Sequence, residues 1–559
     1  MNEQPAKATI ASGEVCVGDL IAAFLEGCGL TTAFGVISIH NLPILDAIAR
    51  RGRIRFIPAR GEAGALNMAD AYARVSGGLG LGITSTGVAA GNAAGSLIEA
   101  MVAGSPVLHL TGQIETSYLD KGQAYIHEAP DQPGMLKAIS KSFFRASRAG
   151  EVLEVLTTAV QTALTAPMGP VSVEIPIDVQ SARIDLPSAF SAPLIECPAM
   201  PHPVDRDALV EALIESKRPL LWLGGGARAA SEAAMRLVEK GIGVVTSVNG
   251  RGIVPEGHPL SLGAFNNAPP VEAFYQSVDL MVVVGSRLRG NETLKYTLGL
   301  PGNLIRIDVD AAVDGRSYPN QRFICADADC VLSELAGRLP DRLSLDPSYA
   351  SDLRAARTAA VTGLMAALGP YAELVDQLQT AIPKNVPFVR DVTLSNSTWG
   401  NRLIELSTPQ QGVHALGGGI GQGLAMAIGA SCAAPGSKTV ALIGDGGLAV
   451  NLGELATLVQ ERADIVILLM NDKGYGVIRN IQDAHYGGRR NYVDLTTPDF
   501  AQLACALGLA HSRVESIAGF GVAFDAALAR EGPALIEIDM DAIGPFAEPF
   551  AGPLVRERS

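Results

Sequence analysis

The sequence predicts an α/β protein with several parallel sheets, on three observations. Apolar runs of strand length alternate with helical patterns, as where RIRFIPAR (53–60) is followed by GEAGALNMADAYARVSG (61–77) and LGLGITST (79–86). Such alternation is typical of βαβ units. Some apolar runs end in glycine or an acid, as NLIRIDVD (303–310) does. The chain of 559 residues is also several times longer than one usual domain.

Changes of pattern divide the chain into three α/β domains. The first extends over 1–187 and ends at a proline-rich stretch. The second extends over 200–340 and contains the strand pattern of RPLLWLGGGAR. An alanine-rich helical stretch over 341–370 predicts a linker, and the third domain extends over 371–559. The first and third domains share the same rhythm of strands and helices.

The composition excludes several classes of protein. The formal net charge is -14, with 43 basic against 57 acidic residues and no long basic run, which argues against nucleic acid as a partner. No segment is apolar enough over sufficient length for a membrane span, and the first residues lack the pattern of a signal peptide. Seven scattered cysteines without a CxxC pair are typical of a reducing compartment. We therefore expect a cytoplasmic protein that acts on small molecules.

Two predicted strands near the end of the chain finish in polar residues. TVALIG runs into Asp445, Gly446 and Gly447, and IVILLM runs into Asn471 and its neighbours. The carboxyl ends of parallel strands meet at one edge, where open α/β sheets bind ligands. We expect a helix from Asn451 or Leu452 to point its N-terminus at this edge, which favours a phosphate group.

The same edge offers ligands for a hard divalent cation. Asp445 provides a carboxylate, Asn471 an amide oxygen and Lys473 a backbone carbonyl, all of which suit Mg²⁺. An isolated Gly-Asp-Gly is commonly a plain strand-to-helix turn. Here the asparagine follows Asp445 by 26 residues, with a helix and an apolar strand between them.

This arrangement resembles the thiamine-diphosphate signature of the superfamily that includes pyruvate oxidase, acetolactate synthase and benzoylformate decarboxylase. The resemblance covers nearly the whole chain and implies a pyrimidine-binding domain, a central Rossmann-like domain and a diphosphate-binding domain. It implies thiamine diphosphate and Mg²⁺ as cofactors. It also implies that the cofactor is bound by residues of the two strand ends: Gly444, Asp445, Gly446, Gly447, Asn471, Lys473, Gly474 and Tyr475.

Three further positions match this superfamily. Glu62 in PARGEAGALNMA corresponds to the glutamate that protonates the pyrimidine N1′, so that the 4′-amino group can deprotonate the thiazolium C2. In GGGIGQGLAMAIGA, Ile420 corresponds to the residue that bends the cofactor, and Gly418 to the carbonyl that receives the 4′-amino group. The loop TSTGVAAGNAAG (84–95) resembles the pyrimidine-side loop but is one residue longer before Asn92 than in acetolactate synthases.

Two histidines are the strongest further catalytic candidates. By resemblance, His40 lies in a substrate-facing loop, and His127 takes the place of a glutamine in the acetolactate synthase motif AFQE. Both can move a proton or anchor a carboxylate. His414 and His485 are weaker candidates. Any one of these histidines taken alone is more commonly structural than catalytic.

The resemblance implies a carbon–carbon lyase or carboligase that decarboxylates a 2-oxo acid to an enamine, which then takes a proton or a second carbonyl compound. Hydroxy-ketones are alternative substrates. It also implies that each site lies between two subunits, so we expect a homodimer or homotetramer. Acetolactate synthases are the nearest members, since Lys141 and Trp399 match that subgroup. GVISIHN (35–41) and Ile481 depart from it and put strict acetolactate synthesis in doubt.

Several alternatives stay open. They are a simple 2-oxo acid decarboxylase of the benzoylformate decarboxylase type, a hydroxy-ketone lyase, a coenzyme-A-ester decarboxylase, an acetyltransferase that forms acetyl phosphate and a flavin-dependent pyruvate oxidase. A catalytically silent regulatory subunit is the non-enzyme alternative, and the presence of Glu62, Asp445 and Asn471 argues against it. The central domain of relatives can hold FAD or ADP or neither, and we expect no flavin here. The tail over 544–559 is expected to be a disordered end rather than a lid over the site.

Overall fold

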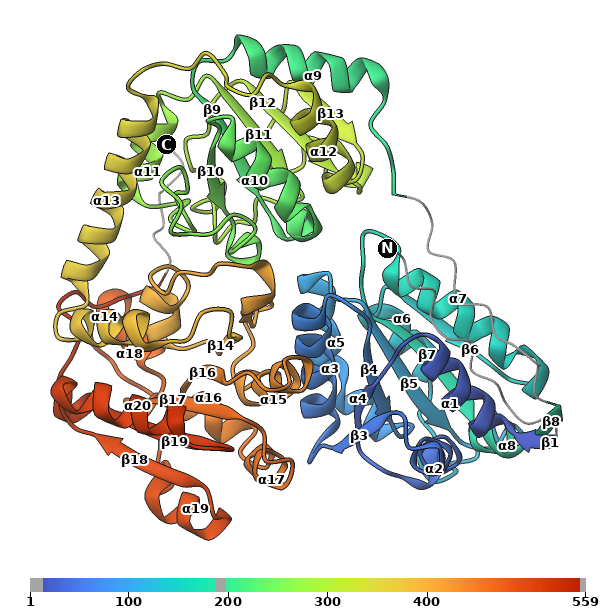
Figure 1. The fold of residues 1–559 in the computed structure, drawn as a ribbon. Coiled ribbons are helices and arrows are strands. Elements are labelled where there is room, and N and C mark those ends of the chain that lie inside the picture. The colour runs from blue at the N-terminus through green and yellow to red at the C-terminus, as the bar shows by residue number, and fades with distance from the viewer. Residues whose placement is uncertain (1–13, 186–197, 553–559) are drawn as a thin grey trace.

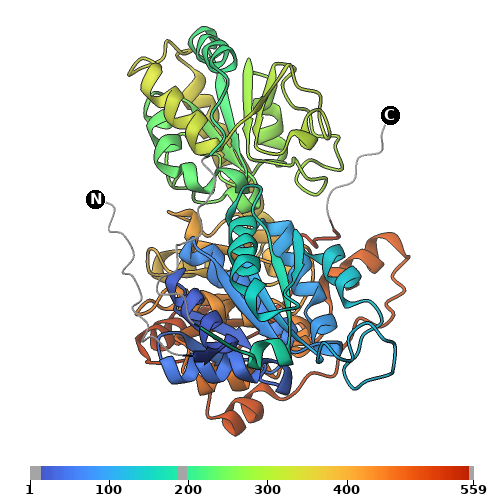
Figure 2. The ribbon, with the colours of Figure 1, turned by 90° about the vertical axis from the view of Figure 1, so that its right-hand side faces the viewer.

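The computed structural model describes residues 14–185 and 198–552. It contains three α/β domains, each built on one parallel sheet, which confirms the predicted fold class. The central domain stacks on one side of the other two (Figure 1 and Figure 2). None of the helices in the described part of the chain is both long and apolar enough to cross a membrane.

The first domain has six parallel strands and a short antiparallel pair that joins its two ends. The parallel order is β3-β2-β4-β5-β7-β6, and β1 pairs with β8. The strands are β1 (Glu14–Cys16), β2 (Thr32–Gly35), β3 (Arg55–Pro58), β4 (Gly80–Thr84), β5 (Val107–Gln113), β6 (Ser142–Arg145), β7 (Val171–Pro176) and β8 (Arg183–Asp185). The helices are α1 (Val17–Gly27), α2 (Leu42–Arg51), α3 (Glu62–Ser76), α4 (Val88–Asn92), α5 (Ala94–Ala103), α6 (Gln132–Ile139), α7 (Val152–Leu164) and α8 (Ile177–Ser181).

The central domain has five parallel strands in the order β10-β9-β11-β12-β13. They are β9 (Pro219–Leu223), β10 (Gly243–Thr246), β11 (Leu280–Val284), β12 (Leu304–Asp308) and β13 (Arg322–Cys325). The helices are α9 (Pro203–Glu215), α10 (Ser231–Glu239), α11 (Pro269–Tyr275) and α12 (Ala328–Arg338). Most of the stretch that we predict as a linker forms α13 (Tyr349–Ala367). This helix packs on the central domain, where the Tyr349 hydroxyl accepts a hydrogen bond from Gly243 N at 3.0 Å.

The third domain has six parallel strands in the order β15-β14-β16-β17-β19-β18. They are β14 (Phe388–Arg390), β15 (Gly412–His414), β16 (Thr439–Gly444), β17 (Ile465–Asn471), β18 (Ala510–Val514) and β19 (Ala534–Asp539). The helices are α14 (Tyr371–Ala381), α15 (Gly423–Ala433), α16 (Asp445–Val450), α17 (Glu454–Gln460), α18 (Gly476–His485), α19 (Phe500–Leu507), α20 (Phe520–Ala529) and α21 (Met540–Ile543). This strand order repeats that of the first domain, β3-β2-β4-β5-β7-β6, strand for strand.

The first and third domains share one apolar core, formed where α3 packs on α15. Small residues let the two helices approach closely: a Cβ on Gly429 would lie 2.0 Å from the carbonyl oxygen of Met68. The helices run in opposite directions, since Arg74 near the end of α3 donates to the His414 carbonyl at 2.6 Å, shortly before α15 begins. This packing fixes how the two halves of the predicted site lie in one chain.

Part of the tail belongs to the core rather than to a disordered end. Phe546 is buried and its ring meets that of Tyr371 edge-on, with centroids 4.6 Å apart. Glu548 N donates to the Ala367 carbonyl at 2.9 Å. The expectation of a disordered end is therefore wrong for 544–552, because a buried aromatic side chain anchors it; residues 553–559 lie outside the described part.

Candidate active site

Asp445 and Asn471 lie at the ends of neighbouring strands. β16 and β17 pair in parallel with Gly444 opposite Met470, so the two side chains meet at one edge of the third sheet. Asp445 is buried, and its Oδ1 accepts a long bond of 3.4 Å from Asp472 N. Its Oδ2 is buried without a hydrogen-bond partner. An unpartnered buried carboxylate oxygen costs free energy that a bound cation would offset, so these residues fit a Mg²⁺ site.

The neighbouring carboxyls also favour a cation. Burial raises the pKa of Asp445. Burial and then the charge of Asp445 raise the pKa of Asp472 to about 7. A divalent ion beside these groups would reverse both effects. Among the residues that the structure describes, no three His, Cys, Asp or Glu side chains cluster as a metal site, so a cation here depends on amide and carbonyl oxygens as well.

The orientation of the Asn471 amide is fixed by an acid behind it. Asn471 Nδ2 donates to Glu537 Oε1 at 2.8 Å, and the other oxygen of Glu537 lies 2.9 Å from His511 Nε2. Because a carboxylate accepts, the amide turns its nitrogen to Glu537 and keeps Oδ1 for other contacts, of which Lys473 N at 3.2 Å is one. Such outer partners hold metal ligands in place.

The Lys473 carbonyl, predicted as a ligand of the cation, already has a hydrogen-bond partner. Lys473 has a positive φ of 55°, and its carbonyl accepts a hydrogen bond from Leu495 N at 3.0 Å. A carbonyl oxygen has a second lone pair, so coordination is still possible. The Lys473 ammonium turns away to Asp541, 2.7 Å distant.

At three of the predicted glycines of this edge, any larger residue would clash with neighbouring atoms. A Cβ on Gly446 would lie 2.8 Å from the Tyr475 ring, one on Gly447 would lie 2.6 Å from Asp391 Oδ2, and one on Gly474 would lie 2.2 Å from the Val493 carbonyl. The predicted helix start at Asn451 or Leu452 is wrong. α16 begins at Asp445 itself, because the small residues after it allow a helical turn directly against the strand ends.

The segment with Gly418 and Ile420 is held by a buried acid that the sequence analysis missed. Gly418 and Gly421 both have φ of +83°, and Ile420 is 38% exposed. Both carboxylate oxygens of Asp391 accept from Gly421 N, at 3.1 and 3.0 Å. Burial raises the pKa of Asp391 to about 6. Asn451 Nδ2 donates to the Gly421 carbonyl at 2.5 Å and links this segment to α16.

Glu62 begins α3 in the first domain and is half-buried. Its Oε2 accepts from Asn92 Nδ2 at 3.1 Å, so the loop that resembles the pyrimidine-side loop does reach this acid. His40 and His127 come together near the same loop, with ring centroids 5.0 Å apart at 75°. A Cβ on Gly87 would lie 2.3 Å from the His127 carbonyl. Burial and then His127 lower the pKa of His40.

Within one chain, Glu62 and the Gly418 segment lie at opposite ends of α3. Glu62 stands at the start of α3, whereas the other end of that helix lies beside the Gly418 segment. Residues 62 and 74 are separated by about 18 Å along a helix axis. Glu62, His40 and His127 thus form a first-domain group, and the residues of the 418–420 and 444–475 segments form a third-domain group.

Lys141, Trp399 and His414, which the sequence analysis also singled out, are held by contacts or buried in the structure. The Lys141 ammonium donates to the carbonyls of Thr162 and Thr165, both at 2.6 Å. Trp399 is fully buried. His414 lies 3.1 Å from Asn396 Nδ2, and burial with the charge of Arg390 lowers its pKa well below the usual value. His485 is exposed at the end of α18.

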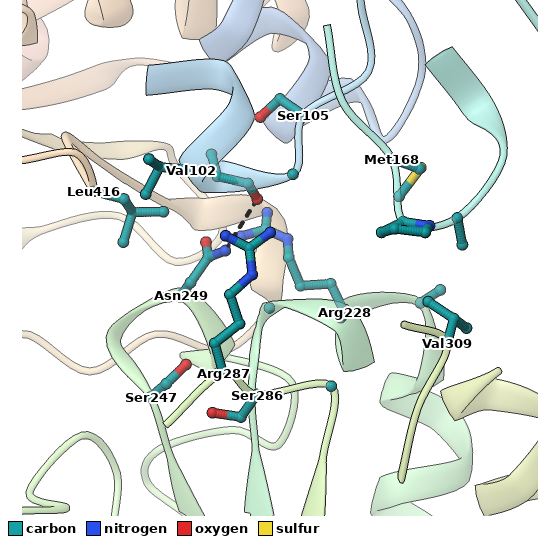
Figure 3. Close-up of a pocket in the computed structure, with 18 of the residues that line it drawn as sticks. Val102, Ser105, Met168, Arg228, Ser247, Asn249, Ser286, Arg287, Val309 and Leu416 are labelled. Atoms are coloured by element: carbon teal, nitrogen blue, oxygen red, sulfur yellow. Dashed lines mark hydrogen bonds between the residues drawn. The ribbon is translucent and has the colours of Figure 1, made fainter. Parts of the chain in front are cut away.

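A cavity of about 470 Å³ lies between the central and first domains (Figure 3). Glycines 225, 226 and 285 line it, together with Asp308 at the end of β12. Arg228 and Arg287 also line it (Figure 3), so an anionic group would find positive charge there. Burial and then Arg74 lower the pKa of Arg228 to about 10. Leu416 of the third domain also lines this cavity (Figure 3), whereas none of the predicted residues of the 444–475 segment does.

Known proteins match this chain along most of its length. The family model described as the N-terminal TPP binding domain of thiamine pyrophosphate enzymes matches residues 16–135, the central-domain model matches 206–335 and the C-terminal TPP binding domain model matches 394–538. A probable 2-ketoarginine decarboxylase of Pseudomonas aeruginosa is 31% identical over 93% of both chains. The chain belongs to the thiamine pyrophosphate enzyme family.

Two further members of this family match as extensively. Acetolactate synthase isozyme 1 large subunit of Escherichia coli is 29% identical over 94% of both chains. A probable acetolactate synthase large subunit of Methanocaldococcus jannaschii is 28% identical over 94% of this chain and 91% of its own. The protein is thus a thiamine-diphosphate-dependent enzyme of the carboligase and decarboxylase type, as predicted, and its three domains correspond to the three domains of that family.

Proposed function

We propose that the protein is a thiamine-diphosphate- and Mg²⁺-dependent carbon–carbon lyase or carboligase that acts on a 2-oxo acid, with acetolactate synthases as its nearest functional model. The observation that carries the proposal is the pairing of Asp445 with Asn471 at adjacent strand ends, where a buried Asp445 oxygen lacks a partner. When bound, the cofactor supplies a nucleophilic thiazolium carbon and an electron sink for decarboxylation.

The residues of this chain then have defined tasks. Asp445 and Asn471 would hold the cation, with the Lys473 carbonyl as a third ligand. Glu62 holds a proton at the pyrimidine N1′. The carbonyl of Gly418 would accept a hydrogen bond from the amino group of the cofactor, and Ile420 would support the cofactor ring system. His40 and His127 anchor the carboxylate of the substrate or transfer a proton to the product.

A homodimer is the smallest assembly that this proposal allows, and a homotetramer is consistent with it. Glu62 lies a helix length from the Gly418 segment of its own chain, so a second chain has to supply it. Large apolar side chains are exposed around each group of site residues, as an interface requires. They are Ile37, Ile39, Val88 and Ile126 in the first domain and Ile420, Val450 and Ile478 in the third. An active monomer in sedimentation measurements would overturn this assignment.

Simple decarboxylation is the second candidate. The pair of His40 and His127 provides groups that can protonate a product, and a relative carries the name 2-ketoarginine decarboxylase. Purified protein with thiamine diphosphate and Mg²⁺ is incubated with pyruvate, 2-ketoarginine, benzoylformate and acyloins. Carbon dioxide with a hydroxy-ketone supports ligation, and carbon dioxide with an aldehyde supports the decarboxylase. A protein that neither binds thiamine diphosphate nor releases carbon dioxide would refute both.

The cavity between the central and first domains is not needed for this chemistry. We keep the prediction that it holds no flavin, which separates this proposal from a pyruvate oxidase. Absorbance of the purified protein tests it, because a bound flavin gives a yellow protein. An ADP-like ligand in the same cavity would be colourless, and mass spectrometry of the denatured protein would detect it.

A further inference from the structure

Two buried glutamates cross between the first and third domains in opposite directions. Glu454, at the start of α17 in the third domain, accepts with Oε1 from Arg60 N at 3.0 Å and Gly61 N at 3.2 Å. Glu99, in α5 of the first domain, accepts from Leu416 N at 2.7 Å and Gly417 N at 2.6 Å. Each acid therefore binds two consecutive backbone amides of the opposite domain.

The two acids lie on topologically equivalent helices. α5 is the second helix after β4, and α17 is the second helix after β16, the corresponding strand in the repeated order. Both side chains are nearly inaccessible, with exposures of 1% for Glu99 and 2% for Glu454. Charge-assisted bonds to amides are strong at such depth.

Glycine makes room for both carboxylates. A Cβ on Gly64 would lie 2.2 Å from Glu454 Oε1, and one on Gly417 would lie 2.8 Å from Glu99 Oε2. A second anchor holds each acid. Thr457 Oγ1 donates to Glu454 at 2.7 Å, and Arg74 pairs with Glu99 at 2.9 Å.

The bound amides lie directly before the residues that the proposed function uses. Arg60 and Gly61 precede Glu62, while Leu416 and Gly417 precede Gly418. We propose that Glu454 and Glu99 are reciprocal positioning residues: each acid, carried by one thiamine-binding domain, fixes the segment through which the other domain takes part in catalysis. The catalytic half of this inference rests on the proposed function.

The geometry predicts unequal tolerance to glutamine. Glu454 serves both amides with one oxygen and uses the other for Thr457, whose hydroxyl can also accept from an amide. Glu454→Gln can therefore keep both backbone bonds. Glu99 uses one oxygen for each amide, so Glu99→Gln loses one of the two.

Amide hydrogen exchange of the full chain without cofactor, followed by mass spectrometry, tests the positioning. Glu454→Ala is expected to raise exchange at Arg60 and Gly61 by about tenfold or more and to leave 415–418 unchanged. Glu99→Gln should raise exchange at 416–417 alone, and Glu454→Gln should resemble the wild type. Glu461→Ala is the matched control, since Glu461 directly follows α17 and also pairs across the domains, with Arg55 at 2.6 Å.

Unchanged exchange at 60–61 in Glu454→Ala, or an equal rise along the whole chain, would overturn the inference. If Glu454→Ala does not fold, the comparison of Glu99→Gln with Glu454→Gln tests the inference, because only Glu99→Gln should loosen its segment.

Turnover with saturating cofactor is the second measurement: Glu454→Ala should lose about tenfold or more in kcat, and Glu454→Gln should restore most of it. Because exchange needs no cofactor, a failure of the proposed function would abolish the turnover difference and leave the exchange pattern intact.

Discussion

The first and third domains have the same strand order and contribute different chemistry. In the first domain, β4 leads into Ser85 and Thr86, and the nearby catalytic candidates are Glu62 and two histidines. In the third domain, the corresponding strand β16 leads into Asp445, beside Asn471. Under the proposed function, one half moves protons and the other binds a cation and phosphate. The difference teaches that a repeated fold positions a site, while a few residues at equivalent strand ends decide its chemistry.

The largest effect is expected from the proton-handling half. Glu62→Gln should reduce turnover by roughly 10²- to 10⁴-fold with cofactor binding retained, because the amide cannot hold the proton at N1′. Steady-state kinetics and cofactor titration measure the two properties. Glu232→Gln is the control, since Glu232 also lies in the first turn of a helix, α10. Near-normal turnover of Glu62→Gln would remove this acid from its role.

A substitution in the cation-binding half should impair cofactor binding rather than turnover alone. Asp445→Ala is expected to weaken thiamine diphosphate binding by about 100-fold or more, and added Mg²⁺ should not restore it. Calorimetric titration with and without Mg²⁺ measures this. Asp464→Asn, just before the other end of β17, should bind normally. The comparison of the domains breaks down if Asp445→Ala binds the cofactor with wild-type dependence on Mg²⁺.

A smaller effect is expected from the acid behind Asn471. Glu537→Gln should lower the affinity for Mg²⁺ by about 10- to 100-fold. A glutamine amide can present a donor to Asn471 Nδ2, and the Asn471 side chain would then no longer be held in one orientation. Activity as a function of Mg²⁺ concentration measures the change, which saturating Mg²⁺ should reverse. Unaltered Mg²⁺ dependence would show that Glu537 does not orient the ligand.

The smallest effect concerns the helix pair that joins the two domains. Gly429→Ala should destabilise the fold by about 1–3 kcal/mol, because its Cβ meets the Met68 carbonyl. Denaturant unfolding measures the free energy. Gly363→Ala in α13, where no atom lies within 4 Å of the added Cβ, should be neutral or stabilise by up to about 1 kcal/mol. Equal effects of the two substitutions would contradict the close approach.

Local patterns were sufficient to predict the fold class and the likeness of the outer domains, and the resemblance to a known superfamily singled out the motifs around Glu62, Gly418 and Asp445. They were not sufficient for Asp391, Glu99 and Glu454. Glu454 bonds Arg60 and Gly61, which precede it by 394 and 393 positions in the chain. Only the packing of the domains creates these hydrogen bonds. The anchoring of Phe546 was missed for the same reason, since its contact with Tyr371 forms only in the folded chain.

The antiparallel packing of α3 on α15 also has a genetic consequence. It places Glu62 and Gly418 of one polypeptide at opposite ends of a helix pair, so the two residues serve different sites if two chains share each site. A cell that expresses one allele with Glu62→Gln and another with Asp445→Ala would then form mixed dimers. In such a dimer, one site carries both lesions and the other carries neither. Two alleles that are inactive alone should complement each other.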